Sequence, residues 1–405
     1  MTLSRHFLGP WLIVSRCLLV GLLVGAIASA SAGAEGQIQR FTVSRDDTHH
    51  QGWPSVCIAS NGDLVCSYAE ADTHGGGSRP RALVCISKDE GRTWSKPIVV
   101  DTVVRASPFG RGFMQCRWIL RLKDGSLLLG CDFNGTSPLN PPGSVHNFPA
   151  DPVNTGDAGA WLYRSRDNGR TWTGPQKTYC LTVSLTMQQL SNGTIILAGS
   201  HYHTKGDYWS QVIYYSKDNA KTWYGPVVVL DDPKYSCGEG HVVEMPGGKL
   251  VMYLRNIAGS KGAFKMISDD GGMSWQGPYA AGYFTPIGRI TAGVLSSGDV
   301  LVMHRVNGPA NKGEALGFFV ETPAAALSRI PYDPATYRPT AKSWGIIDID
   351  TNKEHVDAGY CGWVELPDGD IYAVQYITAD APRGKPFIRG YRIPRSFLTR
   401  QPRNR

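Results

Sequence analysis

The feature that most constrains this chain is an eight-residue segment of the form Ser-x-Asp-x-Gly-x-x-Trp that recurs along it. Four copies span residues 87–94, 165–172, 216–223 and 268–275, with Ala220 in place of the glycine in the third copy. A segment repeated in this way indicates a fold built from equivalent units, each of which packs on its neighbours. We call these segments Asp boxes.

A second repeat consists of six segments in which a polar residue and a glycine separate two apolar runs, as in "ASNGDLVC" and "LKDGSLLL". The glycines are Gly62, Gly125, Gly193, Gly248, Gly298 and Gly369. Asn-Gly and Asp-Gly pairs are typical of two-residue hairpins with type I′ turns, which need positive φ at both central residues. The glycines lie about 50 to 70 residues apart, enough for the four short strands of a propeller blade. The sequence therefore predicts an all-β, six-bladed β-propeller over residues 35–405.

The Asp boxes follow four of these hairpins and are predicted to be turns of the fold. The aspartate can accept hydrogen bonds from the N–H groups of its own turn, and the glycine can adopt a left-handed conformation. The tryptophan can pack between blades. Because four equivalent boxes would mean four equivalent sites, we interpret these aspartates as structural.

Residues 1–34 are predicted to be a secretory signal peptide. Arg5 and Arg16 flank its apolar start, "CLLVGLLVGAIA" follows, and "SASAGA" supplies small residues for cleavage. No later apolar run reaches the roughly 18 residues expected of a membrane-spanning helix. The mature protein is therefore expected to be exported, to the periplasm or the medium, with no membrane span.

Charge and motif content narrow the expected partners. The chain carries a net charge of +7 without a run of Lys or Arg, which argues against nucleic-acid binding and is compatible with an acidic glycan. No CxxC or HExxH spacing occurs, so neither a metal site nor any other cofactor is predicted.

The exported part of the chain contains eight cysteines in a setting that permits disulfides. Cys57 and Cys66 lie symmetrically about Asn61-Gly62, so in a two-residue hairpin they would face each other and could pair. The pairing of the other cysteines is left open.

The Asp boxes and six hairpin units together resemble the sialidase (neuraminidase) superfamily, whose members are six-bladed propellers. The resemblance extends from Gln37 to the C-terminus. It implies an exo-acting glycoside hydrolase that removes a terminal, acidic sugar such as sialic acid from a glycan.

Two segments are similar to the parts of the sialidase fold that carry catalytic residues. In "SCGEGHVVEMPGGKLVMYLRN" the resemblance implies that Glu239 assists a tyrosine nucleophile and that Arg255 binds the substrate carboxylate. In "DAGYCGWVELPDG" it implies that Tyr360 is this nucleophile. The assignment is chemically sensible because a phenol, with a pKa near 10, needs a neighbouring base at neutral pH.

The resemblance is incomplete where sialidases bind the substrate carboxylate with three arginines. Gly52 stands at the position of the first arginine, and either Arg305 or Arg289 is the candidate for the third. His49 and His50 stand at the mouth of the first blade and are predicted to contact the substrate. Imidazoles there could also act as general acid or base near neutral pH.

The remaining catalytic group implied by the resemblance is an acid/base aspartate in the first blade. Asp72, in the glycine-rich loop "EADTHGGGSRPR", is the candidate, and His74 lies beside it. The glycines would allow this loop to close over a substrate.

Two alternative functions remain open at the level of sequence. The first is a lyase or hydrolase of uronic-acid polysaccharide that uses His49 or His50 together with a tyrosine. The second is a glycan-binding propeller without catalysis, because Trp53, Trp118, Tyr360 and Trp363 suit sugar stacking as well as they suit the core.

Overall fold

The computed structural model describes residues 36–74, 79–103, 114–133, 159–203, 206–257, 263–282, 288–307, 313–333, 341, 343–350, 358–380 and 384–399. The predicted signal peptide lies outside these residues. Within them, no helix is both long and apolar enough to span a membrane.

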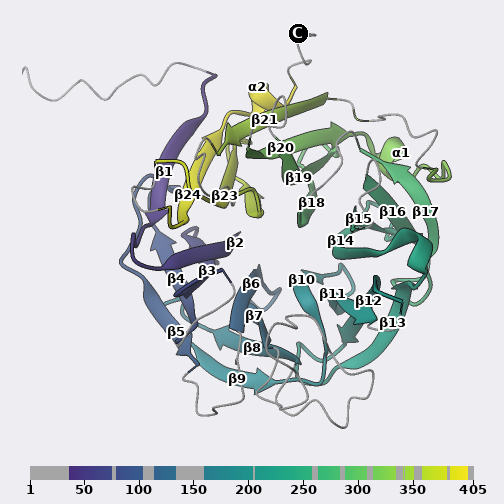
Figure 1. The fold of residues 1–405 in the computed structure, drawn as a ribbon, viewed down its shortest axis with the longest axis horizontal. Coiled ribbons are helices and arrows are strands. Elements are labelled where there is room, and N and C mark those ends of the chain that lie inside the picture. Colours follow the sequence, from purple (N-terminus) through teal and green to yellow (C-terminus); the bar gives the residue numbers. More distant parts are fainter. Residues whose placement is uncertain are drawn as a thin grey trace, which may run out of the picture.

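Six four-stranded antiparallel sheets surround a central axis, which confirms the predicted six-bladed propeller (Figure 1). Blade 1 contains β2 (His50–Ile58), β3 (Leu64–Ala71), β4 (Arg81–Ser87) and β5 (Ile98–Thr102). Blade 2 contains β6 (Met114–Arg121), β7 (Leu127–Phe133), β8 (Gly159–Ser165) and β9 (Thr173–Lys177). Blade 3 contains β10 (Val183–Gln189), β11 (Ile195–His203), β12 (Tyr208–Ser216) and β13 (Tyr224–Leu230).

The second half of the ring follows the same order from the axis outward. Blade 4 contains β14 (Cys237–Glu244), β15 (Leu250–Asn256), β16 (Ala263–Ser268) and β17 (Gln276–Ala281). Blade 5 contains β18 (Ile290–Val294), β19 (Val300–Asn307), β20 (Glu314–Glu321) and β21 (Ser343–Ile349). Blade 6 contains β22 (Cys361–Glu365), β23 (Ile371–Ile377), β24 (Phe387–Ile393) and β1 (Gln39–Ser44). The described helices are short: η2 (Pro233–Tyr235), α1 (Pro323–Ala326) and α2 (Arg395–Leu398).

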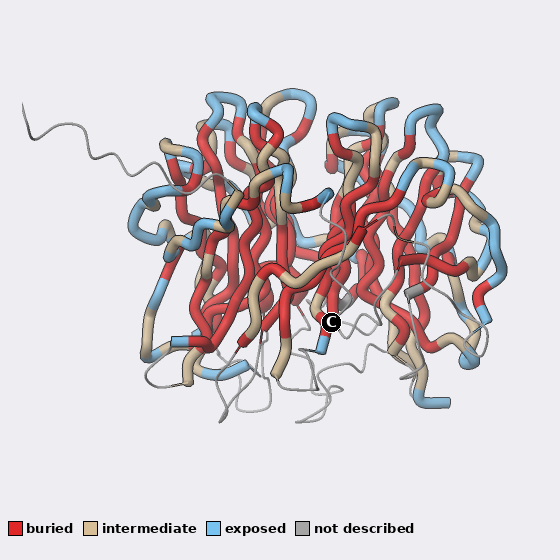
Figure 2. The backbone as a smooth tube through the Cα atoms, turned by 90° about the horizontal axis from the view of Figure 1, so that it is seen from above, coloured by how far each residue is buried: buried red, intermediate tan, exposed pale blue. Residues whose placement is uncertain are grey.

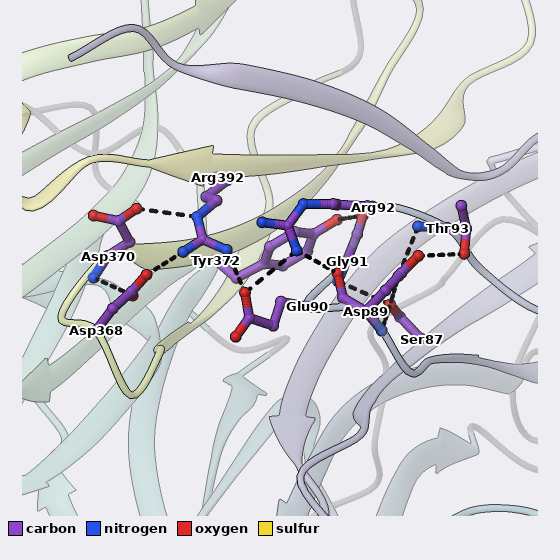
Figure 3. A network of polar contacts seen from close by, with 10 residues as sticks. All are labelled: Ser87, Asp89, Glu90, Gly91, Arg92, Thr93, Asp368, Asp370, Tyr372 and Arg392. Carbon is purple, nitrogen blue, oxygen red and sulfur yellow. Dashed lines mark hydrogen bonds and ion pairs between the residues drawn. The ribbon is translucent and has the colours of Figure 1, made fainter. Parts of the chain in front are cut away.

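The two ends of the chain meet in blade 6. Strand β1 pairs with β24 as the outermost strand of that blade, so the first described strand completes the last sheet (Figure 1). Arg392 of β24 then connects this blade to the first one: its Nη1 lies 2.6 Å from Glu90 and its Nε 3.0 Å from Asp370, and it also pairs with Asp368 (Figure 3). The ring is thus closed by backbone pairing and by an ion-pair network.

The Asp boxes are turns, as predicted. In the first box Asp89 Oδ1 accepts hydrogen bonds from the Thr93 N–H (2.9 Å) and the Ser87 hydroxyl (2.8 Å), and Asp89 Oδ2 accepts the Thr93 hydroxyl at 2.6 Å (Figure 3). Gly91 has φ +86°, and a Cβ at this position would collide with the ring of Tyr372 in blade 6. Corresponding bonds recur at Asp167, Asp218 and Asp270.

The glycine hairpins form a different turn from the predicted one. In the first hairpin Ala59 N–H bonds to Asp63 O at 2.9 Å and Gly62 N–H to Ala59 O at 3.0 Å, and Gly62 has φ +88° whereas Asn61 has no positive φ. This is a three-residue loop, a type I turn followed by a left-handed glycine. The same pair of backbone bonds occurs in all six hairpins.

This turn also corrects the predicted disulfide. The third loop residue shifts the pairing by one position, so that Cys57 lies opposite Val65 and Cys66 opposite Val56. Because neighbouring residues of a strand point to opposite faces of its sheet, Cys57 and Cys66 point away from each other. Both are free, buried thiols, as are the other six described cysteines.

The core lies between blades, where each sheet packs its apolar face on the next. Ile196 and Ala198 of blade 3, for example, share one buried cluster with Val242 and Leu250 of blade 4. Figure 2 shows the buried strands in the middle of the disc and exposed turns along one face. The hairpins and Asp boxes belong to this face, which we call the turn face. The inner strands begin at the opposite face, which we call the site face.

We predict that Asp89→Ala lowers the free energy of unfolding by about 1 to 2 kcal/mol, because it removes a set of turn hydrogen bonds comparable to a helix cap. Urea unfolding measures this change as a shift of the midpoint at constant slope. Lys88→Ala, an exposed neighbour in the same box, is the control and should leave the midpoint unchanged. Equal effects of the two substitutions would contradict the structural role of the aspartate.

Candidate functional site

The inner strands of four blades are irregular near the site face. Their pairing with the second strand shifts register at Trp53, Arg117, Ser184 and Glu239. Three of these residues have positive φ: +55° at Trp53, +59° at Ser184 and +55° at Glu239. Non-glycine residues rarely adopt this conformation, and such bulges re-aim side chains near functional sites. The irregularities therefore mark the site face as the place to look for chemistry.

Three residues predicted from the sequence meet there. The Tyr360 hydroxyl donates a hydrogen bond of 2.7 Å to Glu239 Oε1. Arg255 Nη1 donates to Glu239 Oε2 at 2.9 Å and to the Tyr360 oxygen at 3.1 Å. Tyr360 immediately precedes β22, Glu239 lies in the bulge of β14, and Arg255 lies near the end of β15. The three groups come from blades 4 and 6, across the axis.

The charges around this cluster set its protonation. Burial alone would raise the pKa of the Glu239 carboxyl, but Arg255, the Tyr360 hydroxyl and Arg117 hold it below its ordinary value. Burial and the Glu239 charge raise the pKa of Tyr360 to about 12, although Arg255 and Arg305 act in the opposite direction. At neutral pH the pair is therefore a phenol and a carboxylate, and Glu239 is placed to accept the phenol proton.

Arg305 lies on the other side of the Tyr360 ring. Its guanidinium carbon is 4.5 Å from the ring centroid, and its Nη2 donates to the Tyr376 hydroxyl at 2.7 Å. Arg305 Nε lies 3.3 Å from Glu314 Oε2. Arg305, predicted to bind substrate, therefore lies against Tyr360, the predicted nucleophile.

Arg289, the other candidate for the third arginine, lies in the centre of the propeller. It is fully buried and donates to the carbonyl oxygens of Arg117 (2.8 Å), Pro54 (2.9 Å) and Cys361 (3.2 Å). These carbonyls belong to blades 2, 1 and 6, whereas Arg289 immediately precedes the inner strand of blade 5. Arg289 therefore joins four blades, and its contact with substrate stays a prediction.

The two predicted histidines have different surroundings. His49 is held in a surface turn, with Nδ1 2.9 Å from Asp46 Oδ2. His50 is buried at the start of β2, where its ring centroid lies 5.3 Å from Trp53, 5.3 Å from His74 and 5.9 Å from Tyr376. His50 is therefore the histidine that joins the aromatic residues beside Tyr360.

Asp72 lies at the same end of blade 1. It follows Ala71, which pairs with His50, and its carbonyl accepts a hydrogen bond of 2.7 Å from Lys385 Nζ. Its role as acid/base stays a prediction.

A hydrogen-bond network that was not predicted from the sequence reaches the Glu239 carboxylate. Arg117 Nε donates to Asp132 Oδ2 at 2.9 Å, and Asp132 also accepts the N–H groups of Ser184 (2.6 Å) and Leu185 (3.3 Å). The Ser184 hydroxyl donates to Glu239 Oε1 at 3.3 Å. Asp132 is the last residue but one of the second strand of its hairpin, as Arg255 is in blade 4, so the same position in every blade is where such a residue could be sought.

One cluster in the described residues has the composition of a metal site. Asp46, His49 and Glu70 each offer a ligand atom, and these atoms lie within 4.8 Å of one another. However, Glu70 is already ion-paired with Arg81 and accepts a hydrogen bond of 2.9 Å from Gln51. A carboxylate neutralised in this way is a poor ligand for a cation.

Comparisons with known proteins agree with the fold. The family described as "BNR repeat-like domain" matches residues 134–372. A Dyadobacter fermentans protein of unknown function is 22% identical, with a TM-score of 0.66 over 88% of this chain and 99% of that one. A Hadza microbial sialidase is 16% identical, with a TM-score of 0.64 over 88% of this chain and 69% of that one.

A Penicillium chrysogenum alpha-L-arabinanase complexed with arabinobiose is 17% identical, with a TM-score of 0.56 over 88% of this chain and 98% of that one. None of the curated proteins matches the chain. The expected resemblance to the sialidase superfamily is thus confirmed, and at these identities the solved structures support the fold.

We predict that Arg255→Met lowers the free energy of unfolding by about 3 kcal/mol at neutral pH, because it leaves the Glu239 carboxylate buried without its main partner. In the native protein the depressed pKa of Glu239 contributes stability above the ordinary pKa of a glutamate, and this contribution is lost as the pH falls. The difference between native and variant should therefore shrink below about pH 4. Urea unfolding at several pH values measures it.

The double variant Arg255→Met/Glu239→Gln is the control for this experiment. It removes both charges and should recover most of the stability lost in Arg255→Met. A double variant as unstable as the single one would show that the loss comes from packing.

Proposed function

Because this chain belongs to the family of BNR repeat-like domain proteins, we propose that it is an exported glycoside hydrolase of the sialidase-like class, which removes a terminal, acidic sugar such as sialic acid from a glycan. The observation that carries the proposal is the hydrogen bond of 2.7 Å between the Tyr360 hydroxyl and Glu239. On the site face, this contact places a carboxylate where it can take the phenol proton and so activate Tyr360 as a nucleophile.

In the first step, the Tyr360 oxygen attacks the anomeric carbon and its proton passes to Glu239 Oε1. Asp72 gives a proton to the leaving oxygen, and a glycosyl–tyrosine bond replaces the glycosidic bond. In the second step, water attacks the same carbon and gives a proton to Asp72, while the departing Tyr360 oxygen recovers its proton from Glu239. A neutral phenol suits an anionic sugar because it brings no second negative charge to the reacting carbon.

The arginines favour an acidic substrate. Arg255 has the more exposed side chain of the two beside Tyr360, at 27% against 12% for Arg305, and a guanidinium fork fits a carboxylate. Gly52 supplies no cation where sialidases have their first arginine, and the nearby Arg117 is bound by Asp132. The class of acidic sugars is therefore better supported than sialic acid itself.

A second candidate is a lyase or hydrolase of uronic-acid polysaccharide. It is favoured by the position of His50, whose ring lies beside Trp53, His74 and Tyr376. A histidine there could remove the C5 proton of a uronic acid while Arg305 neutralises the carboxylate. Similarity to an arabinanase fold shows that propellers of this shape accept other sugars.

We predict that mature protein releases the fluorophore from an umbelliferyl sialoside or cleaves an acidic polysaccharide, and that Tyr360→Phe abolishes this activity. The same panel is read by ultraviolet absorbance, because a lyase leaves an unsaturated sugar and a hydrolase does not. Sialoside cleavage would support the first proposal, and an absorbing product would support the second.

Tyr372→Phe is the matched control for this screen. Tyr372 is a buried tyrosine of the same blade, but its hydroxyl bonds to Gly91 O on the turn face, so activity should be retained (Figure 3). A loss of activity in both variants would point to folding, and no activity in the native protein on any substrate would favour a binding propeller.

A further inference from the structure

Asp132 is a buried carboxylate near the site that the proposed reaction does not use. It lies at the end of β7, and its side chain is 8% exposed. Three donors hydrogen-bond to it: Arg117 Nε and the N–H groups of Ser184 and Leu185. Burial raises the pKa of the Asp132 carboxyl above its ordinary value, whereas Arg117 and the two N–H groups act in the opposite direction, so these donors are what stabilise a charge on it.

The two backbone bonds fix an unfavourable conformation. Ser184 has φ +59° in the bulge of β10, in the left-handed region that is unfavourable for a non-glycine residue. The bond of 2.6 Å from its N–H to Asp132 stabilises this conformation from the neighbouring blade. Without that acceptor, we expect the backbone of Ser184 to leave the left-handed region.

The conformation of Ser184 determines what Glu239 Oε1 meets. From the bulge, the Ser184 hydroxyl donates to Oε1 at 3.3 Å, the same oxygen that accepts the Tyr360 hydroxyl at 2.7 Å. Arg255 holds the other carboxylate oxygen. The carboxylate is thus fixed on both oxygens, and one of its fixed points depends on Asp132 two blades away.

We propose that Asp132 is a positioning residue for the Tyr360–Glu239 pair: it holds Ser184 in the conformation from which the serine hydroxyl orients the Glu239 carboxylate toward the nucleophile. The catalytic consequence of this inference rests on the proposed function. The contacts from Asp132 through Ser184 to Glu239 do not depend on it. Arg117 has a role too, because this arginine compensates the charge of Asp132.

The test compares Asp132→Asn and Ser184→Ala. Asparagine keeps the shape of Asp132 but replaces an acceptor by a donor, and alanine removes only the serine hydroxyl. Each should lower kcat by about 10- to 100-fold, the effect of one lost hydrogen bond to a charged group, with little change in KM. Because both act through the same contact, the double variant should be no worse than the more affected single variant.

The pH profile provides a readout that a purely structural role would not move. The groups facing Glu239 are Arg255, Tyr360, Ser184 and, at longer range, Arg117 and Arg289. Loss of the serine donor disfavours the ionised carboxylate and raises the pKa of Glu239, so the acidic limb of kcat/KM should move to higher pH in both variants. The change is specific because the three arginines stay in place in Ser184→Ala.

A second measurement does not depend on turnover. In protein labelled with carbon-13 at glutamate carboxyl groups, the Glu239 resonance is identified by its absence in Glu239→Gln, and its titration is followed in each variant. Asp348→Asn is the control, since Asp348 is also an arginine-paired aspartate, 3.2 Å from Arg389, but lies in blade 5. Its substitution should leave the Glu239 titration unchanged.

A higher Glu239 pKa in both Asp132→Asn and Ser184→Ala would support the proposal. An unchanged titration in Ser184→Ala would overturn it, and so would an unchanged titration in a folded Asp132→Asn. If both variants shift the titration but the native protein cleaves no glycan, the positioning role stands and the proposed reaction fails.

Discussion

A single buried cation holds the middle of this propeller together. Arg289 donates to carbonyl oxygens of Pro54, Arg117 and Cys361, and these three residues lie on the inner strands of blades 1, 2 and 6. An isolated charge at this depth would be strongly unfavourable, and the three carbonyl oxygens stabilise it as hydrogen-bond acceptors. Since Tyr360 directly precedes Cys361, the same contact that joins the blades also fixes the backbone that carries the catalytic candidate. Fold and site therefore share one anchor.

The site also depends on unfavourable backbone conformations in several blades. Trp53, Ser184 and Glu239 each adopt positive φ in an inner strand, and no two of them belong to the same blade. Packed sheets and buried hydrogen bonds fix these conformations, as the contact of Ser184 with Asp132 illustrates. A closed ring of packed blades allows this, because each unfavourable backbone conformation is stabilised by contacts with the neighbouring blades.

The sequence predicted the parts of this molecule that are local. Glycine hairpins and Asp boxes recur along the chain, so blade number followed from them, and Glu239, Arg255 and Tyr360 were implied by the resemblance of two hairpin segments to sialidases. The turn type was wrong by one residue, since Asn-Gly also fits a three-residue loop, and this reversed the facing of two cysteines. The contacts of Arg289 with other blades, and the role of Ser184, were not predicted, because burial and contacts between blades have no signature in a single segment.

The pairing of β1 with β24 has a consequence for how the protein is made. These strands stand at opposite ends of the described chain, from Gln39 to Ile393, yet they are neighbours in one sheet. β1 is synthesised long before its partner β24. Blade 6 therefore cannot be completed on the ribosome until β24 has emerged. Such distant pairing is slow, because a long loop must close before any contact repays its entropy. Until β24 has been made, β1 has no partner strand in blade 6, and the six blades cannot close into a ring.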